Sequence, residues 1–170
     1  MVDYGKIKVL VLDVDGVLTD GGIIVGTDGS EMKKFNSLDG HGIKMWQRAG
    51  NIAAFLSGRT SAPTEQRARQ LEVEYCLQEC HDKLVAFNKL AADIGVDFLE
   101  IAYIGDDLPD LPPMRAAGFS AAAANAVEEV RKSADYVTKR RGGDGAVREV
   151  IEYLLKRSEK WEVLMQRYIQ

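Results

Sequence analysis

Short apolar runs that end in an acid or a small residue are the feature that most constrains this chain. Ile7–Asp13 (IKVLVLD) is apolar almost throughout and stops abruptly at its acid. Similar runs lie at Ile52–Ser57, Ile101–Gly105 and Tyr136–Thr138, with weaker ones around Tyr75–Leu77 and Phe119–Ala122. Runs this short and this apolar are typical of strands buried on both faces of a parallel sheet.

Segments with helical spacing separate these runs. Ile43, Trp46 and Ala49 precede Gly50, and a second apolar series ends at Ile94 before Gly95. Glycine at these positions suits the end of a helix. Strand and helix therefore alternate, which predicts an α/β fold: a three-layer, Rossmann-like parallel sheet with helices on both faces.

One segment, residues 22–35, breaks the alternation. Two short strand-like pieces flank Asp28-Gly29 there, which is a strong hairpin signal. Because the segment follows the first strand at once, the hairpin should project from the sheet near that strand's carboxyl end. With no repeat or linker in the sequence, residues 1–170 are predicted to be a single domain.

The tail, residues 159–170, carries apolar residues on one stripe of an amphipathic helix. Packing of this helix on its own domain and docking on a partner subunit both remain open.

Composition argues against several functions. A formal net charge of −4 is unsuited to a surface built for nucleic acid or an anionic membrane. No apolar stretch approaches the ~20 residues of a membrane span, and residues 1–6 lack the pattern of a signal peptide. Cys76 and Cys80 do not make a disulfide framework or a zinc site. We therefore expect a cytoplasmic protein with no nucleic-acid or membrane partner.

Polar residues capable of chemistry follow the predicted strands. They are Asp13, Asp15, Ser57, Lys83, Asp106 and Asp107. Ligands of open α/β sheets bind at this edge, where packed carboxylates repel one another and need a cation to stay ionised. All-oxygen ligands favour a hard ion such as Mg²⁺, which also binds waters and phosphate oxygens. The sequence therefore predicts a site for magnesium and a phosphate group together.

Each residue has a predicted role. Asp13, the first residue after the buried strand, is the expected nucleophile and would form an aspartyl-phosphate. Asp15 would protonate the leaving oxygen and then activate water. Ser57 would hydrogen-bond the phosphoryl oxygens, and Lys83 would offset their charge.

The expected metal ligands are Asp13, Asp15, Asp106 and Asp107, the last directly or through water. Taken alone, Asp13 and Asp15 could instead cap a turn, and Lys83 could be a solvated helix residue.

Four motifs in order resemble one enzyme superfamily. The segment 13–20 (DVDGVLTD) resembles the first motif of the haloacid-dehalogenase phosphatases, and Ser57-Gly58-Arg59, Lys83 and residues 105–110 (GDDLPD) look like the others. Residues 35–40, the pair Arg59 and Arg67, and residues 142–149 resemble the branch of 3-deoxy-D-manno-octulosonate 8-phosphate phosphatases and their relatives for nine-carbon keto-acid sugars. The resemblance implies a homotetramer without a cap domain, in which hairpins and neighbouring subunits close each active site.

The resemblance also implies a sugar-acid site. Its residues would be Asp15, Gly16, Asn36, Ser37, Leu38, Asp39, Gly40, Lys44, Gly58, Arg59, Arg67 and Lys83. A carboxylate plus a phosphate needs cations beyond Lys83, although Arg67 could also face solvent. The chain departs from the family at Leu38, where a basic residue is common, and at His41 and Lys44.

The leading hypothesis is magnesium-dependent hydrolysis of 3-deoxy-D-manno-octulosonate 8-phosphate through an aspartyl-phosphate, a step toward lipopolysaccharide. Two alternatives stay open. One is a phosphatase for a nine-carbon acid, such as 2-keto-3-deoxynonulosonate 9-phosphate. The other is a largely non-catalytic oligomerisation module, which the intact set of Asp13, Asp15, Lys83 and Asp106 argues against.

Overall fold

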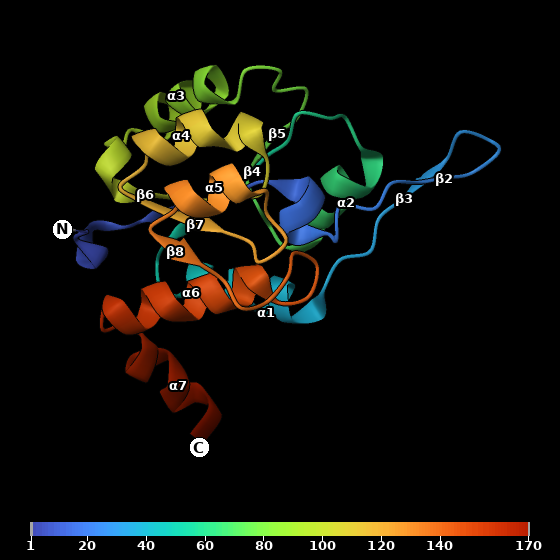
Figure 1. The fold of residues 1–170 in the computed structure, drawn as a ribbon. Coiled ribbons are helices and arrows are strands. Elements are labelled where there is room, and N and C mark those ends of the chain that lie inside the picture. The colour runs from blue at the N-terminus through green and yellow to red at the C-terminus, as the bar shows by residue number, and fades with distance from the viewer. Residues whose placement is uncertain (1, 170) are drawn as a thin grey trace.

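The sheet is parallel and has six strands in the order β5-β4-β1-β6-β7-β8, in a computed structural model that describes residues 2–169 (Figure 1). Its strands are β1 (Val9–Leu12), β4 (Ile52–Leu56), β5 (Tyr75–Leu77), β6 (Ile101–Gly105), β7 (Phe119–Ala122) and β8 (Tyr136–Val137). The helices are α1 (Ser37–Arg48), α2 (Ala62–Gln70), α3 (Lys83–Ile94), α4 (Leu111–Ala116), α5 (Glu128–Ser133), α6 (Ala146–Arg157) and α7 (Trp161–Ile169), with short turns η1 (Tyr4–Lys6), η2 (Val14–Leu18), η3 (Phe98–Glu100) and η4 (Leu108–Asp110).

The central strand, β1, explains the fold. It pairs in parallel with β4 on one side and β6 on the other, and all four of its residues are buried. Because side chains alternate across a strand, Val9 and Val11 enter one hydrophobic core while Leu10 and Leu12 enter the other. A strand with a core on both faces has no polar face, which is why its sequence is apolar at every position.

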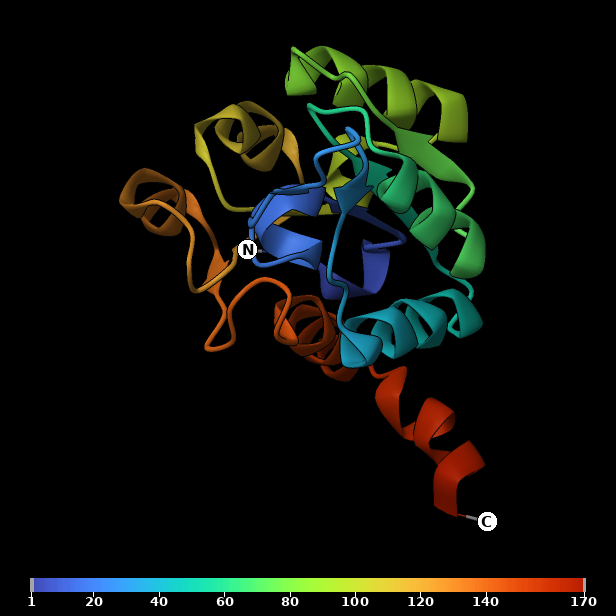
Figure 2. The same cartoon turned by 90° about the vertical axis from the view of Figure 1, so that its right-hand side faces the viewer.

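Helices cover both faces of the sheet. Side chains of α3, α4 and α5 complete one core, and those of α1 and α6 complete the other. Figure 1 and Figure 2 show these groups on opposite sides of the strands. The predicted three-layer α/β fold is thus confirmed, and every predicted strand is present. Gly95 ends α3 in the left-handed region, with φ of 78°, as its position in the sequence suggested.

The hairpin projects from the body (Figure 1), as the sequence predicted. It consists of β2 (Ile24–Val25) and β3 (Glu31–Met32), which pair antiparallel. Gly29 adopts a φ of 82° in the connecting turn, a conformation that glycine takes without steric cost. Apart from this hairpin, the described residues hold no insertion that could act as a cap over the sheet edge.

The C-terminal helix α7 extends away from the body (Figures 1 and 2). It meets its own chain through Trp161 and Leu164, which are partly buried against the core, while Val163 and Ile169 are 69% and 77% exposed. Among residues 2–169, no helix combines the length and the apolar character needed to cross a membrane.

Candidate active site

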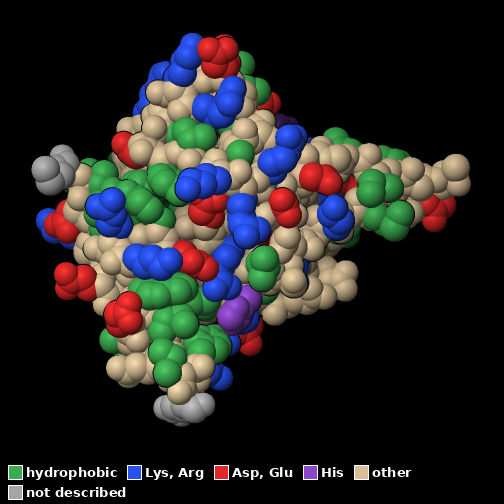
Figure 3. Space-filling model, turned by 60° about the horizontal axis from the view of Figure 1, so that its bottom comes forward, with side chains coloured by type: hydrophobic (Ala, Val, Ile, Leu, Met, Phe, Trp, Pro, Cys, Tyr) green, Lys and Arg blue, Asp and Glu red, His purple; other side chains and the backbone are tan. Residues whose placement is uncertain are grey.

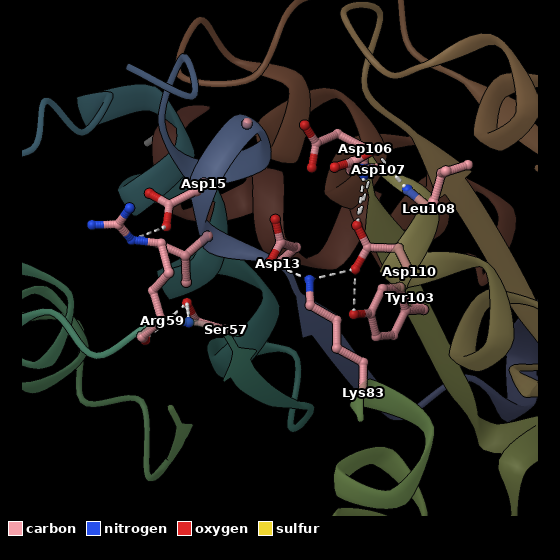
Figure 4. Close-up of polar contacts among 12 residues, drawn as sticks. Asp13, Asp15, Ser57, Arg59, Lys83, Tyr103, Asp106, Asp107, Leu108 and Asp110 are labelled. Atoms are coloured by element: carbon pink, nitrogen blue, oxygen red, sulfur yellow. Dashed lines mark hydrogen bonds and ion pairs between the residues drawn. The ribbon is translucent and has the colours of Figure 1, made fainter. Parts of the chain in front are cut away.

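A cavity of about 290 Å³ opens at the carboxyl ends of β1, β4 and β6. Its walls are Asp13, Asp15, Ser57, Gly58, Arg59, Cys80, His81, Lys83, Asp106, Asp107, Pro109 and Asp110. The structure therefore brings all six predicted catalytic and metal residues to one place (Figure 4). A larger groove of about 510 Å³ lies along α6 and contains none of them. Its carboxylates Glu149 and Glu152 are already bonded within the chain.

Asp13 stands at the end of β1 and is only 5% exposed. Its N–H still donates to the Ile104 carbonyl of β6, at 3.0 Å, so the strand fixes its backbone. The chain then turns at Gly16, whose φ is 99°. A Cβ at Gly16 would lie 1.9 Å from Oδ2 of Asp106, so only glycine lets the loop approach that carboxylate.

Lys83 lies between two carboxylates. Its Nζ donates to Oδ1 of Asp13 and to Oδ1 of Asp110, at 2.6 Å in each case. The lysine is the first residue of α3, and Asp82 caps that helix by accepting from the N–H groups of Leu84 and Val85. The helix start therefore aims the ammonium into the cavity.

Asp110 holds the site together, and the sequence analysis gave it no role. Besides Lys83, its Oδ1 accepts from the Tyr103 hydroxyl at 2.8 Å. Its Oδ2 accepts from the N–H groups of Asp106 and Asp107, at 3.0 and 3.2 Å (Figure 4). Gly105 gives it room, since a Cβ there would lie 2.4 Å from the Cβ of Asp110. The signal in the sequence was the position of Asp110 at the end of the segment 105–110.

Electrostatics distinguish these groups. Burial and Asp110 raise the pKa of Asp13 well above its usual range, and Lys83 offsets them only in part. Burial and Asp110 also raise the pKa of Asp106, to about 6. For Lys83, burial lowers the pKa, but Asp13 and Asp110 outweigh burial and raise it to about 12. The lysine therefore stays charged, while the acids around it repel one another.

This donor set fits a divalent cation. Carboxylate oxygens of Asp13, Asp106 and Asp110 lie within 4.8 Å of one another. Oδ1 of Asp106 is buried and has no hydrogen-bond partner among the described residues, whereas both oxygens of Asp110 are engaged. Oδ1 of Asp13 accepts from Lys83, so the oxygens left to ligate are Oδ2 of Asp13 and those of Asp106. A hard ion with oxygen ligands suits them.

Asp15 and Asp107 direct their carboxylates elsewhere. Oδ1 of Asp15 accepts from Nζ of Lys33 at 2.6 Å, and its Oδ2 lies 3.9 Å from Nε of Arg59. Asp107 caps η4 by accepting from the Leu108 N–H at 2.8 Å. Both still line the cavity.

Ser57 ends its strand in a tight turn. Its hydroxyl donates to the Arg59 carbonyl and accepts from the Arg59 N–H, at 3.2 Å in each case. The side chain is 2% exposed. Gly58 and Arg59, which follow Ser57, line the cavity, and Figure 4 shows Arg59 beside Asp15.

The other residues predicted to bind a sugar acid lie outside this cavity in the single chain. Asn36 caps α1, and Arg67 donates to the Asn36 carbonyl at 3.3 Å. Asp39 is 1% exposed and accepts from the backbone N–H groups of Gly145 and Arg148 in the loop before α6 and its first turn. Ser37, Leu38, Gly40 and Lys44 share α1 with it.

Two residues of the site that the sequence analysis missed come from the hairpin. Lys33 contacts Asp15, and Glu31 lies 3.7 Å from both Lys33 and Arg59. Glu31 lies in β3 and Lys33 directly follows it, and a spacing of two in extended chain puts both side chains on one side. The spacing of Glu31 and Lys33 could be read from the sequence, but the contact of Lys33 with Asp15 could not.

Comparison with known proteins identifies the family. The family model of haloacid dehalogenase-like hydrolases matches residues 76–151. The chain is 42% identical to the 3-deoxy-D-manno-octulosonate 8-phosphate phosphatase KdsC of Yersinia pestis, over 92% of this chain and 84% of that protein. The chain belongs to this phosphatase family.

Solved structures of the family have the same fold. A probable YrbI family phosphatase from Pseudomonas syringae superposes with a TM-score of 0.95 at 46% identity, covering 98% of this chain and 96% of that one. The Moraxella catarrhalis 3-deoxy-D-manno-octulosonate 8-phosphate phosphatase superposes with a TM-score of 0.94 at 40% identity, covering 97% and 95%. That structure is a complex with a magnesium ion, a phosphate ion and a KDO molecule.

Proposed function

We propose that this protein is a magnesium-dependent phosphatase that hydrolyses 3-deoxy-D-manno-octulosonate 8-phosphate to the free sugar acid and phosphate, a step toward lipopolysaccharide. The observation that carries the proposal is the meeting of Asp106 with the buried side chains of Asp13 and Lys83 in one cavity at the carboxyl edge of the sheet. The chain is also 42% identical to a phosphatase of that name over 92% of its length.

The proposed reaction has two steps. In the first, a carboxylate oxygen of Asp13 attacks phosphorus, and the bond from phosphorus to the sugar oxygen breaks. Asp15 gives its proton to that leaving oxygen. In the second step, Asp15 takes a proton from water, which attacks phosphorus and releases phosphate from Asp13. Ser57 and Lys83 hydrogen-bond and neutralise the phosphoryl oxygens.

Magnesium is the proposed cofactor, held by Asp13 and Asp106. When bound, it supplies the positive charge that lets a carboxylate approach an anionic phosphoryl group. Asp15 and Asp107 remain proposed ligands, Asp107 directly or through water. Asp110 supports the site by orienting Lys83 and the backbone of residues 106 and 107.

The sugar acid is proposed to extend from the cavity toward the start of α1. Arg59 and Arg67 would pair with its carboxylate, because guanidinium groups recognise carboxylates well. Gly16 and Gly58 would lie near the phosphate. Further contacts are proposed for Asn36, Ser37, Leu38, Asp39, Gly40 and Lys44.

We also propose a cytoplasmic homotetramer. The hairpin exposes Ile23, Ile24, Val25 and Met32 by 50%, 49%, 65% and 59%, and Figure 3 shows hydrophobic side chains on the part of the molecule that projects. Apolar surface of this kind is typical of a protein interface. Cys76 and Cys80 are free thiols, which fits a reducing compartment.

The test is phosphate release from a panel of sugar and sugar-acid phosphates, with magnesium and with EDTA. We expect a magnesium-dependent preference for the eight-carbon keto-acid phosphate, and loss of turnover in Asp13→Asn. A preference for a nine-carbon acid would keep the chemistry and change the substrate. Absence of turnover with every substrate would favour the oligomerisation module instead.

A further inference from the structure

Lys33 belongs to a closed ring of alternating charges beside the cavity. Its Nζ lies 2.6 Å from Oδ1 of Asp15 and 3.7 Å from Oε1 of Glu31. Arg59 completes the ring, with Nη2 at 3.7 Å from Oε1 of Glu31 and Nε at 3.9 Å from Oδ2 of Asp15. The ring joins the hairpin to the loops that follow β1 and β4.

The hairpin aims Lys33 inward. Glu31 begins β3 and Lys33 directly follows it, and the two side chains lie on the same side, 3.7 Å apart. They are 17% and 0% exposed. The neighbouring residues are exposed instead: Met32 is 59% exposed, and the side chain of Lys34 is 75% exposed. An ammonium that is fully buried in ion pairs is held in one position, unlike a lysine on a solvated surface.

Lys33 is also the firmest contact of the Asp15 carboxylate. Among the described residues it is the one side chain or backbone group that donates a hydrogen bond to Asp15, since the Arg59 contact is a longer ion pair. Arg59 is 45% exposed and is itself proposed to bind substrate. Without Lys33, the Asp15 side chain would be free to change rotamer.

We propose that Lys33 is a positioning residue for Asp15, and that the hairpin thereby sets the geometry of proton transfer to the leaving sugar oxygen. The inference rests on the proposed function, in which Asp15 protonates that oxygen. Proton transfer requires hydrogen-bond reach, and a small displacement of the acid slows it strongly.

The experiment separates positioning from folding through the leaving group. A sugar-acid phosphate releases an alkoxide that needs a proton, whereas p-nitrophenyl phosphate releases a phenolate that leaves without one. The rate of leaving-group release in the first turnover, with saturating magnesium, isolates this step for both substrates. We expect Lys33→Met to slow release from the sugar-acid phosphate about 100-fold and release from the aryl phosphate less than about 3-fold.

Matched variants complete the design. Lys33→Arg should restore most of the rate with the sugar-acid phosphate. Lys34→Met, at the next residue, whose side chain is 75% exposed, should leave both rates unchanged. In an Asp15→Asn background, Lys33→Met should cause no further loss, because the two residues act as one unit.

Two results would overturn the inference: an unchanged rate with the sugar-acid phosphate, or equal losses with both substrates. Failure of the proposed function is a different observation, namely full activity in Asp13→Asn. The inference alone fails if Asp13→Asn is inactive while Lys33→Met behaves like Lys34→Met.

Discussion

Asp110 is a buried carboxylate that organises the candidate site through its hydrogen bonds. Its two oxygens accept from Lys83, Tyr103 and two backbone N–H groups. Both Lys83 and Asp110 are buried, so water does not replace the missing partner when one of the two is removed. Loss of one partner from such a pair leaves an uncompensated charge in a poor solvent for it.

Replacing Asp110 by Asn should therefore be costly. The amide NH₂ would face other donors, either Lys83 or the backbone N–H groups of Asp106 and Asp107. We expect the free energy of unfolding, measured with urea, to fall by about 3 kcal/mol and kcat to fall with it. Asp93→Asn removes an exposed carboxylate paired with Lys89 and should change stability by less than about 0.5 kcal/mol. Equal stability of the two variants would contradict the role assigned to Asp110.

Asp106 makes the metal-free site sensitive to pH. Burial and Asp110 raise its pKa to about 6, so the folded state binds this proton more tightly than the unfolded chain does. The contribution of Asp106 to stability is therefore greatest at acid pH and is lost as the pH rises through about 6. In the presence of EDTA, the free energy of unfolding of wild type should fall more steeply than that of Asp106→Asn as the pH rises from 3.8 to about 6.

Magnesium should reverse that loss at neutral pH. A ligand that binds only the folded state raises its stability, so magnesium should raise the Tm of wild type. Asp106→Asn should show little or no such rise, because one of the two available carboxylates is gone. A magnesium-induced shift of the same size in both proteins would exclude Asp106 as a ligand.

At the scale of elements, the sequence predicted the strands and helix ends that depend on nearby residues, but not the contacts between elements that are distant in the chain. Strand β1 could be predicted because each of its residues meets a core, and the end of α3 because Gly95 takes a positive φ. The contact of Lys33 with Asp15 could not, because it depends on how the hairpin leans over the sheet edge. Asp110 accepts from two backbone N–H groups of its own loop, which lie near it in sequence. Its contact with Lys83 could not be predicted, because Lys83 comes from the distant helix α3.

Helix α7 is the element that the sequence left most open. Trp161 lies under Nζ of Lys156, which is 4.6 Å from the ring centroid, and the Tyr168 hydroxyl accepts from Arg48 at 3.0 Å. We expect Trp161→Ala to lower the free energy of unfolding by about 1 to 2 kcal/mol. Val163→Ala, at a position that is 69% exposed, should change it by less than about 0.5 kcal/mol.

The two variants distinguish the possible dockings of α7. The expected difference, measured by thermal and urea unfolding at low protein concentration, would show that α7 packs on its own chain. A larger effect of Val163→Ala, growing with protein concentration, would instead show that the outer side of α7 docks on a partner subunit.

At the scale of the whole molecule, the two sides of the hairpin have different surroundings. Its inner side carries Glu31 and Lys33 to the active site, while its outer side exposes apolar residues such as Ile24 and Met32. A two-stranded hairpin is marginally stable by itself, so burying that outer side against another copy would also fix its inner side. Assembly and catalysis would then depend on the same few residues.

The double variant Ile24→Asp, Met32→Asp tests this dependence. Light scattering should give the mass of four chains for wild type and a smaller mass for the variant, because two charges would have to be buried in the interface. If the interface also steadies Lys33, the variant should lose more of its rate with the sugar-acid phosphate than with the aryl phosphate. Val85→Asp, at a position on α3 that is 63% exposed, should leave the mass unchanged. A wild-type protein with the mass of one chain would contradict the tetramer, and the hairpin would then have to hold Asp15 in place without help from a neighbour.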